Sequence, residues 1–295
     1  MPKGQIIRAL SSFYYVRSED KVIECKARGL FKKNKQSPLV GDFVTFNIVN
    51  DIQGYITEIE ARKNELRRPP ISNVEQAVLV FSVKEPELSI LLLDKFIIHI
   101  EKADITPIIC LSKTDLLNDE STQLMESQTE KYQNVGYTVI QTSKYGKGIA
   151  ELKATLQGKT SVFAGQSGVG KSTLLNSLLP DLNLETAAIS QRLGRGKHTT
   201  RAVQLVELPE GGKVADTPGF SQLDFKGIES VTLDDLFAEF REYLNQCRFR
   251  RCQHTNEPGC MVRSAVEENK INKDRYQHYL MFLEEIKKIE ENKWR

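Results

Sequence analysis

The sequence predicts a multidomain α/β protein in which three differently patterned regions follow one another. Residues 1–68 contain short runs rich in Val, Ile, Phe and Tyr, separated by turn-like polar segments and without a helical pattern. Residues 69–226 alternate apolar runs with helical patterns, and residues 227–295 carry charged helical patterns around a group of cysteines. We therefore expect a small β-barrel, then a mainly parallel α/β sheet, then a helical domain.

The composition is that of a soluble protein with substantial cores. Of the 295 residues, 40% are hydrophobic and 27% are charged, which excludes wholesale disorder. No apolar run reaches the roughly 18–20 residues of a membrane span, and the N-terminus lacks the apolar core of a signal peptide. Five cysteines argue against a secreted disulfide scaffold and favour a reducing compartment. We expect a cytoplasmic protein without a membrane partner.

The first region is predicted to form a closed barrel, because its strand-like runs are close together and no helix separates them. These runs cover residues 5–16, 21–29, 42–50 and 54–62. Pro69 and Pro70 cannot continue a strand or a helix, so residues 66–70 are expected to be a linker. Although the net charge is only +2, residues 1–40 hold nine Lys and Arg against three acidic residues, so this end is locally basic.

The second and third regions are predicted from apolar periodicity. A continuous apolar run at 75–83 indicates a strand buried on both faces, and further strands are expected at 105–111, 137–143, 160–165 and 213–217. Helical spacing occurs between them, at 91–104 and 121–136. An amphipathic helix is expected at 232–244. A last helical pattern carries Val266, Tyr276, Tyr279, Leu280, Leu283 and Ile286.

A phosphate-binding loop is predicted between the strand at 160–165 and the helix that follows. Its residues match G-x-x-x-x-G-K-[ST] in full: Gly165, Gln166, Ser167, Gly168, Val169, Gly170, Lys171 and Ser172. Glycines let successive backbone N–H groups turn inward around a phosphate. Lys171 would place a positive charge at the β- and γ-phosphates, and Ser172 offers a hydroxyl to Mg²⁺. The helix N-terminus, with Thr173, points its positive end at the same anion.

Two further segments support a nucleoside triphosphate site. Residues 214–219 form an apolar strand that ends in Asp-x-x-Gly, so Asp216 would reach Mg²⁺ through water and the Gly219 N–H would sense the γ-phosphate. Residues 194–200 are basic and contain glycines, as in a switch loop whose threonine closes on Mg²⁺. An ordinary surface loop is the alternative interpretation of that stretch.

The base-reading candidates come before the phosphate loop in the chain. Ser112, Lys113, Thr114 and Asp115 are similar to the N-K-x-D motif of GTPases, in which the Asp accepts the N1 and N2 protons of guanine. Thr142, Ser143 and Lys144 correspond to its usual S-A-K partner. Both segments follow predicted strands, where α/β sheets bind ligands. Because an ordinary GTPase has these motifs after the phosphate loop, the order predicts a circularly permuted P-loop GTPase.

A metal site is predicted in the third region. Cys247, Cys252, His254 and Cys260 place four soft or borderline ligands within fourteen residues, and Cys₃His is a standard set for structural zinc. Four protein ligands leave no open position, which disfavours a catalytic zinc. Unrelated thiols on a loop are the alternative. Cys25 and Cys110 are expected to be buried apolar side chains, and His99 and His278 to be structural.

Together these residues resemble the RsgA family, also called YjeQ or YloQ, of bacterial GTPases that depend on the small ribosomal subunit. The resemblance covers the whole chain. It implies an OB-fold barrel that binds 16S rRNA, GTP hydrolysis with Mg²⁺ activated by the 30S subunit late in its maturation, and one structural Zn²⁺ in a monomer. The basic residues 1–40 would face rRNA phosphates.

The resemblance also implies roles in the switches. Thr200 would bind Mg²⁺, with Thr199 as the fallback. Phe220 stands where Ras-like enzymes carry the Gln that orients water, so His198 becomes the candidate for positioning the attacking water. Ser112 replaces the usual Asn, and a hydroxyl is shorter and has one donor. We predict weaker guanine affinity, with specificity retained through Asp115.

Three other functions remain open at this point. One is a permuted GTPase that acts on the large subunit. Another is an RNA-binding assembly protein whose nucleotide site is structural and hydrolyses little GTP. The third is an ATPase or kinase that shares only the phosphate loop.

Overall fold

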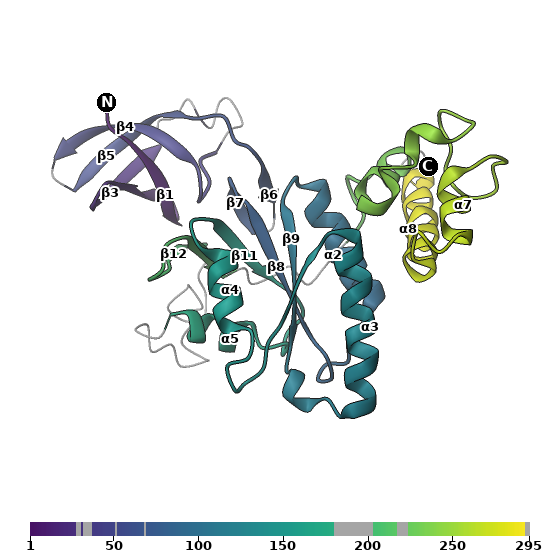
Figure 1. The fold of residues 1–295 in the computed structure, drawn as a ribbon. Coiled ribbons are helices and arrows are strands. Elements are labelled where there is room, and N and C mark those ends of the chain that lie inside the picture. The colour runs from purple at the N-terminus through teal and green to yellow at the C-terminus, as the bar shows by residue number, and fades with distance from the viewer. Residues whose placement is uncertain are drawn as a thin grey trace.

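The computed structural model of the chain describes residues 1–27, 31, 37–50, 52–67, 69–179, 203–216 and 224–292. A barrel, a central α/β sheet and a helical C-terminal part follow one another, as the sequence predicts (Figure 1). Among the described residues, no helix combines the length and the apolar character needed to span a membrane.

The N-terminal barrel is closed and has five strands in the order β1-β2-β3-β5-β4. They are β1 (Lys3–Leu10), β2 (Phe13–Ser18), β3 (Lys21–Ala27), β4 (Phe43–Asn50) and β5 (Gln53–Ile59). The single strand expected at 5–16 is wrong, because a turn at Ser11, whose φ is +54°, divides it into the hairpin β1–β2. Cys25 is fully buried in the barrel core, as predicted.

The predicted linker at 66–70 is instead part of a β-hairpin formed by β6 (Glu65–Arg67) and β7 (Pro70–Ser72). Pro70 is tolerated because it begins its strand, where no ladder hydrogen bond has to come from its nitrogen. The fully buried Asp42 fixes this hairpin to the barrel. Its carboxylate accepts hydrogen bonds from Ser72 Oγ at 2.6 Å and from Arg62 Nε at 2.8 Å.

The central sheet has six strands in the order β10-β9-β8-β11-β13-β12. They are β8 (Gln76–Ser82), β9 (Thr106–Ser112), β10 (Thr138–Gln141), β11 (Thr160–Ala164), β12 (Leu205–Glu207) and β13 (Lys213–Asp216). All neighbouring pairs are parallel except β12–β13. The carboxyl ends of five strands therefore meet at one edge, where α/β sheets bind ligands.

Helices cover both faces of the sheet (Figure 1). They are α2 (Ile90–Lys102) and α3 (Asp119–Val135) on one face, and α4 (Ile149–Leu156) and α5 (Lys171–Leu178) on the other. The apolar side chains of β8 divide between two cores. Leu79 and Phe81 pack with α2, and Val78 and Val80 pack with α5. This is why the sequence of β8 is apolar at consecutive positions.

The C-terminal part begins differently from the prediction. The amphipathic α-helix expected at 232–244 is a series of short 3₁₀ helices: η3 (Ser230–Thr232), η4 (Asp234–Leu236), η5 (Ala238–Phe240) and η6 (Leu244–Gln246). Three-residue spacing brings Phe237 and Phe240 to the same side, where both are fully buried. Helices α7 (Met261–Glu267) and α8 (Lys273–Asn292) follow, so the last helical pattern is divided between two helices, with Val266 on α7. Tyr276, Tyr279, Leu283 and Ile286 of α8 are buried as expected, whereas Val266 and Leu280 are half-buried.

A buried charge cluster joins the C-terminal part to the sheet domain. The Arg275 guanidinium of α8 is held between the carboxylates of Asp94 on α2 and Glu239 on η5. Asp94 also accepts hydrogen bonds from Tyr132 Oη at 2.8 Å and His278 Nδ1 at 2.6 Å. Two opposed carboxylates around one guanidinium fix how α8 lies against α2.

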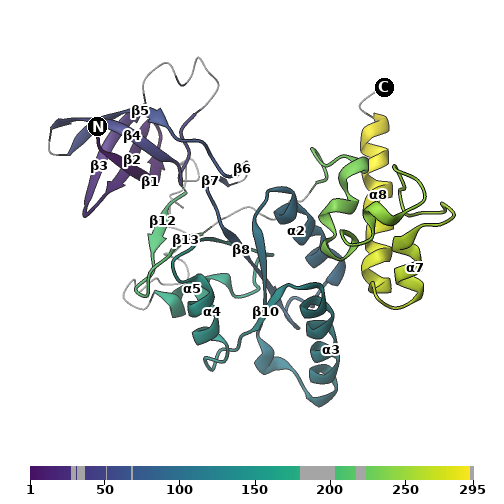
Figure 2. The ribbon, with the colours of Figure 1, turned by 45° about the horizontal axis from the view of Figure 1, so that its top comes forward.

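On the other side of the molecule, strand β1 of the barrel lies beside the edge strand β12 (Figure 2). Arg8 and Gln204 form an antiparallel bridge between them. Lys213 Nζ donates to Gln5 Oε1 at 2.5 Å, and Arg17 pairs with Glu207 at 3.3 Å. The central domain is thus held by the barrel at one end and by the helical part at the other.

Candidate functional site

The predicted phosphate loop connects β11 to α5 at the carboxyl edge of the sheet. Gly165, Gly168 and Gly170 have φ angles of +137°, +82° and +96°. These angles lie in the left-handed region that favours glycine. A Cβ atom at Gly165 would lie 2.1 Å from the backbone oxygen of Val80, so the loop also needs glycine there for space. The sequence places glycine where the backbone has to turn tightly.

Lys171, the first residue of α5, folds back over this loop. Its Nζ atom donates to the backbone oxygens of Gly165 at 2.8 Å and Gln166 at 2.6 Å. The positive charge therefore lies over the loop, beside the helix N-terminus formed by Ser172 and Thr173. A cation, a helix N-terminus and a glycine loop on one small surface suit a phosphate group.

The two base-reading candidates lie together although they are far apart in the chain. The segment 112–115 follows β9, and 142–144 follows the neighbouring strand β10. The Lys144 backbone N–H donates to Asp115 Oδ1 at 3.1 Å, and Lys144 Nζ lies 3.4 Å from Asp115 Oδ2. The backbone N–H of Thr114 donates to the Thr142 oxygen at 3.1 Å. The arrangement holds the Asp115 carboxylate at the sheet edge.

The charge of Asp115 is maintained by its neighbours. The backbone N–H of Lys144 lowers the pKa of the carboxyl group, and the Lys144 ammonium acts in the same direction, while desolvation opposes them. Asp115 is therefore ionised at neutral pH and is an acceptor only. An acceptor of this kind is what two N–H groups of a guanine base require.

Ser112 connects these candidates to the phosphate loop. Its hydroxyl lies 2.5 Å from the backbone oxygen of Val169 and 3.2 Å from that of Phe81, and the side chain is buried. One hydroxyl proton serves one acceptor at a time, and the shorter distance favours Val169. Lys113, with a left-handed φ of +60°, donates from its ammonium to the Glu85 backbone oxygen.

The switch candidates are only partly within the described residues. Asp216 ends β13, and its backbone lies opposite Phe163 of β11, next to the start of the phosphate loop. Residues 194–200, which contain His198, Thr199 and Thr200, lie outside the described residues, as do Gly219 and Phe220. Their assignments therefore remain predictions.

The four predicted metal ligands are brought together. The ligand atoms of Cys247, Cys252, His254 and Cys260 all lie within 4.8 Å of one another. His254 Nδ1 lies 3.3 Å from Cys260 Sγ and 3.7 Å from Cys247 Sγ. Its other nitrogen, Nε2, lies 3.3 Å from Asp234 Oδ2. A carboxylate behind the ligand His is the usual arrangement in zinc sites, where it fixes the ring orientation.

The chemistry of the cluster fits a zinc ion. Burial raises the pKa of the Cys252 thiol, and the neighbouring thiols act in the same direction, so a thiolate there requires a nearby cation. Backbone N–H groups of Met261 and Arg263 point at Cys247 Sγ and Cys260 Sγ, at 3.4 and 3.5 Å. Three thiolates and one imidazole around a single centre are a closed tetrahedral zinc set.

Two residues that support this loop were not identified from the sequence. Asp234, the partner of His254, lies twenty residues earlier in the chain, inside the expected amphipathic helix. The Glu257 carboxylate accepts hydrogen bonds from the backbone N–H groups of Gln253, Thr255 and Asn256. Although desolvation acts to raise it, hydrogen bonds from the backbone N–H groups of Gln253, Thr255 and Glu257 itself lower the pKa of Glu257 to about 2. In the sequence, only the position of Glu257 between two predicted metal ligands could have indicated its role. No feature of the sequence indicated that Asp234 is the partner of His254.

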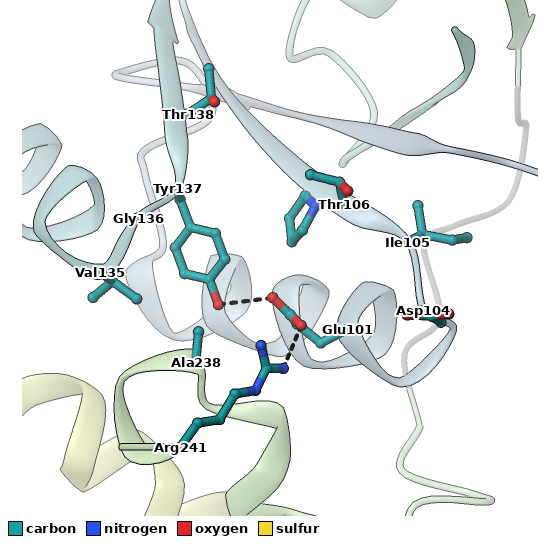
Figure 3. A pocket seen from close by; sticks show the side chains of 11 residues that line it. Glu101, Asp104, Ile105, Thr106, Val135, Gly136, Tyr137, Thr138, Ala238 and Arg241 are labelled. Atoms are coloured by element: carbon teal, nitrogen blue, oxygen red, sulfur yellow. Dashed lines mark hydrogen bonds and ion pairs between the residues drawn. The ribbon is translucent and has the colours of Figure 1, made fainter. Parts of the chain in front are cut away.

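A separate pocket lies at the opposite edge of the sheet. Its volume is about 330 Å³, and Glu101 lies in it between the Tyr137 hydroxyl, at 3.2 Å, and Arg241 Nη2, at 2.7 Å (Figure 3). Thr106 and Thr138, which begin β9 and β10, also line it. Because these are the amino ends of the strands, the pocket is not the nucleotide site.

Comparison with known proteins identifies the family. The model of the RsgA N-terminal domain matches residues 3–56, and that of the RsgA GTPase domain matches residues 59–226. The chain belongs to the RsgA GTPase family. The Small ribosomal subunit biogenesis GTPase RsgA of Bacillus subtilis is 52% identical over 293 residues, covering 97% of this chain and 98% of the relative. That of Geobacillus kaustophilus is 54% identical over 288 residues, with the same coverage.

Two solved structures of the family share the whole fold. YloQ, described as a circularly permuted GTPase, is 45% identical, with a TM-score of 0.84 over 98% of this chain and 96% of YloQ. YjeQ from Thermotoga maritima is 36% identical, with a TM-score of 0.86 over 97% and 98% of the two chains. The permuted order inferred from the motifs is confirmed, and the chain is an RsgA-family GTPase that uses a guanine nucleotide and Mg²⁺.

Proposed function

We propose that this GTPase is a late assembly factor of the small ribosomal subunit and that the 30S subunit stimulates its GTP hydrolysis. The observation that carries the proposal is the 52% identity, over nearly the full chain, to a relative named for small-subunit biogenesis. The proposed partners are the 30S subunit and its 16S rRNA, which this protein would bind as a cytoplasmic monomer. GTP favours the subunit-bound form of the factor, and hydrolysis releases it.

The proposed nucleotide contacts follow the geometry at the sheet edge. Asp115 accepts the N1 and N2 protons of guanine, and its neighbours Ser112, Lys113, Thr114, Thr142, Ser143 and Lys144 shape the base pocket. Residues 165–173 surround the phosphates, with the Lys171 ammonium moving from its loop carbonyls to the β- and γ-phosphates. Mg²⁺ would be held by Ser172, Thr200 and, through water, Asp216. Gly219 would sense the γ-phosphate.

Hydrolysis is proposed to depend on His198. Phe220 follows Gly219, and a phenyl ring can neither orient nor deprotonate water. We infer that contact with the subunit brings His198 to the attacking water. His198→Ala should keep GTP binding and lose the stimulated hydrolysis, and unaltered stimulated turnover would refute this role.

We propose that the chain has three domains with separate roles. Residues 1–68 form an RNA-binding barrel of the OB type, 69–226 the permuted GTPase, and 227–295 the zinc domain. One Zn²⁺ held by Cys247, Cys252, His254 and Cys260 would stabilise the loop between η6 and α7, which has few apolar residues of its own. Arg248, Arg250 and Arg251, between the ligands, are the proposed phosphate contacts of this loop.

The first test is phosphate release from GTP with and without purified 30S subunits, using 50S subunits and ATP as controls. Strong stimulation by 30S alone is the expected result. Stimulation by 50S instead would move the target to the large subunit. Tight GTP binding without stimulation would indicate an RNA-binding protein whose binding depends on nucleotide but which hydrolyses little GTP. Equal use of ATP would overturn the base assignment.

A further inference from the structure

A large exposed tyrosine stands directly after the proposed base-reading segment 142–144. The Tyr145 side chain is 80% exposed, so its ring forgoes the apolar contacts that stabilise buried aromatic side chains. The segment follows β10 at the carboxyl edge of the sheet, and its Lys144 is hydrogen-bonded to Asp115. Because α/β sheets bind their ligands at this edge, an exposed ring here is a candidate contact for the nucleotide.

Hydrogen bonds within a tight turn fix the backbone that carries Tyr145. Its N–H group donates to Ser143 Oγ at 3.3 Å, and the N–H group of Gly146 donates to the Ser143 backbone oxygen at 3.2 Å. The Ser143 N–H group donates to the Lys147 oxygen at 3.3 Å, which closes the turn. Gly146 has a φ of +90°, in the left-handed region that favours glycine. The turn therefore holds the backbone of Tyr145 while its ring stays in solvent.

The ammonium group of Lys144 lies beside both Asp115 and Tyr145. Its Nζ atom is 3.4 Å from Asp115 Oδ2 and 5.0 Å from the centre of the Tyr145 ring. A cation at that distance from a ring is attracted by the negative charge of the π-face. Because one ammonium reaches both groups, the carboxylate and the ring border the same small space. In this structure the chain's own cation occupies that space.

A guanine base can make the same two contacts. Its N1 and N2 protons are donors for a carboxylate, as the ammonium is, and its flat π-face can stack on a phenol ring. The side chain of Lys144 is 61% exposed, so its ion pair with Asp115 is weak and water can take up the ammonium when the base arrives. The base also gains a stacking contact over its whole face, which a point charge does not make.

We propose that the Tyr145 ring stacks on the guanine base, which takes over the two contacts that the Lys144 ammonium makes in this structure. The ring then supplies affinity and not selectivity, because every purine presents a π-face, whereas Asp115 distinguishes their donors. This proposal rests on the proposed base site at Asp115. It adds a residue that lies outside both base-reading segments, 112–115 and 142–144.

The test measures the Kd of the full-length protein for GDP by competition with a fluorescent nucleotide, without ribosomal subunits. The variants are Tyr145→Leu, which removes the ring, and Tyr145→Phe, which keeps it. Tyr55→Leu is the matched control, because Tyr55 is an exposed tyrosine on β5 of the barrel. Inosine diphosphate, which keeps a purine, and inorganic triphosphate, which has no base, are the comparison ligands. Circular dichroism establishes that each variant is folded.

We expect Tyr145→Leu to raise the Kd for GDP about fivefold or more, and Tyr145→Phe and Tyr55→Leu to leave it unchanged. The Kd for inosine diphosphate should rise by the same factor, so the ratio of the two affinities stays that of the wild type. A turn that had lost its shape would change this ratio, because the Lys144 N–H group helps to hold Asp115. Binding of inorganic triphosphate should be the same in every variant.

Unchanged GDP affinity in Tyr145→Leu would overturn the proposal, as would a changed ratio of the two purine affinities. An equal loss for inorganic triphosphate would overturn it too, since the tyrosine would then act on the phosphate loop. A loss that Tyr145→Phe shares would assign the effect to the hydroxyl and not to stacking.

The proposed base site is tested separately, by the nucleotide preference of Asp115→Asn. If that variant prefers xanthine nucleotides while Tyr145→Leu changes nothing, the stacking proposal fails and the base site stands. If neither variant changes guanine binding, the base is bound elsewhere and both proposals fail.

Discussion

The side-chain hydroxyl of Ser112 lies 2.5 Å from the backbone oxygen of Val169, across 57 positions of the chain. The contact joins the proposed base-reading segment directly to the phosphate loop. An Asn amide, the usual residue in the N-K-x-D motif, has two donor hydrogens, whereas a hydroxyl has one. Since the single donor of Ser112 is used by the loop, none is left for the base. This is the physical basis for the expected weaker guanine affinity.

Replacing Ser112 with Ala should therefore lower the affinity for GDP and GTP alike. The Val169 oxygen loses its partner, so the phosphate loop is held less firmly in the conformation that receives a phosphate. A loss of about 1 kcal/mol on nucleotide binding corresponds to about a fivefold rise in Kd. The preference for guanine over adenine should persist, because Asp115 is unchanged. Fluorescent-nucleotide titration measures both effects.

Ser161→Ala is the matched control for that experiment. Ser161 is a fully buried serine of β11, and its hydroxyl accepts from Gln76 Nε2 at 2.9 Å, near the opposite edge of the sheet. It should lower stability without changing the Kd for nucleotide. If Ser112→Ala binds nucleotide as tightly as the wild type, the Val169 contact does not support the site.

Asp115→Asn should shift the preference from guanine to xanthine nucleotides. An Asn side chain offers a donor where xanthine carries an oxygen, whereas guanine there offers its own donor. Because the pKa of Asp115 is lowered in the folded chain, its ionised carboxylate contributes to the stability of the fold at every pH above the ordinary pKa of Asp. That contribution is lost only as the pH falls through the lowered value, so guanine binding should be independent of pH near neutrality.

Competition between GTP and XTP for the variant measures this shift. Asp119→Asn, on the exposed first turn of α3, is the control and should keep the preference of the wild type. A variant at position 115 that still selects GTP would show that another group reads the base.

Local patterns explain which parts of this fold were predictable. The phosphate loop, the buried strand β8 and the amphipathic face of α8 are encoded within a few consecutive residues, and each forms where the sequence predicts it. The permuted order was also visible, because motif order is a property of the sequence itself.

The errors came where long-range packing decides the local structure. The 232–244 segment has helical spacing, but Phe237 packs against Tyr279 of α8, with ring centres 5.4 Å apart, and the backbone follows this packing as short 3₁₀ turns. The pairing of His254 with Asp234 and of Arg275 with Asp94 joins residues that no local motif relates. Such contacts follow from the tertiary fold and leave no signal in sequence spacing.

Removal of the proposed zinc ion should destabilise the C-terminal part. Without the ion, three thiols and one imidazole lose their common partner, and the 247–260 loop has few apolar residues of its own, so we expect a loss of several kcal/mol and a lower melting temperature. Cys260→Ser should reduce the zinc content from one ion per chain towards zero. Metal analysis and thermal denaturation, with and without a chelator, measure both effects.

Cys110→Ala provides the comparison for the zinc experiment. Cys110 is a buried thiol of β9, outside the cluster. Its replacement should leave one zinc per chain, although it lowers stability by opening a small cavity. A purified wild-type protein that contains no zinc and melts identically with a chelator would contradict the metal assignment.

Arg275→Met should be one of the most destabilising single changes at the interface between α2 and α8. Arg275 and Asp94 have side-chain exposures of 2% and 0%, so the variant leaves two buried carboxylates, Asp94 and Glu239, without their cation. Breaking a buried ion pair from one side costs about 3–5 kcal/mol. Arg275→Lys should not restore the loss, because one ammonium cannot bridge both carboxylates as the guanidinium does. Urea denaturation at neutral pH measures the change.

Lys131→Met tests a neighbouring contact, the exposed ion pair between α3 and α8. Lys131 Nζ lies 3.3 Å from the Oδ2 atom of Asp274, which precedes Arg275 in the chain. The side chain of Lys131 is 32% exposed and that of Asp274 is 64% exposed. Solvent screens this pair, so the cost should be at most about 1 kcal/mol. Equal effects of the two methionine variants would mean that the buried cluster does not hold α8 against α2. A large effect of Arg275→Met alone, accompanied by lost 30S stimulation but unchanged GDP binding, would show that this cluster transmits subunit contact to the GTPase domain.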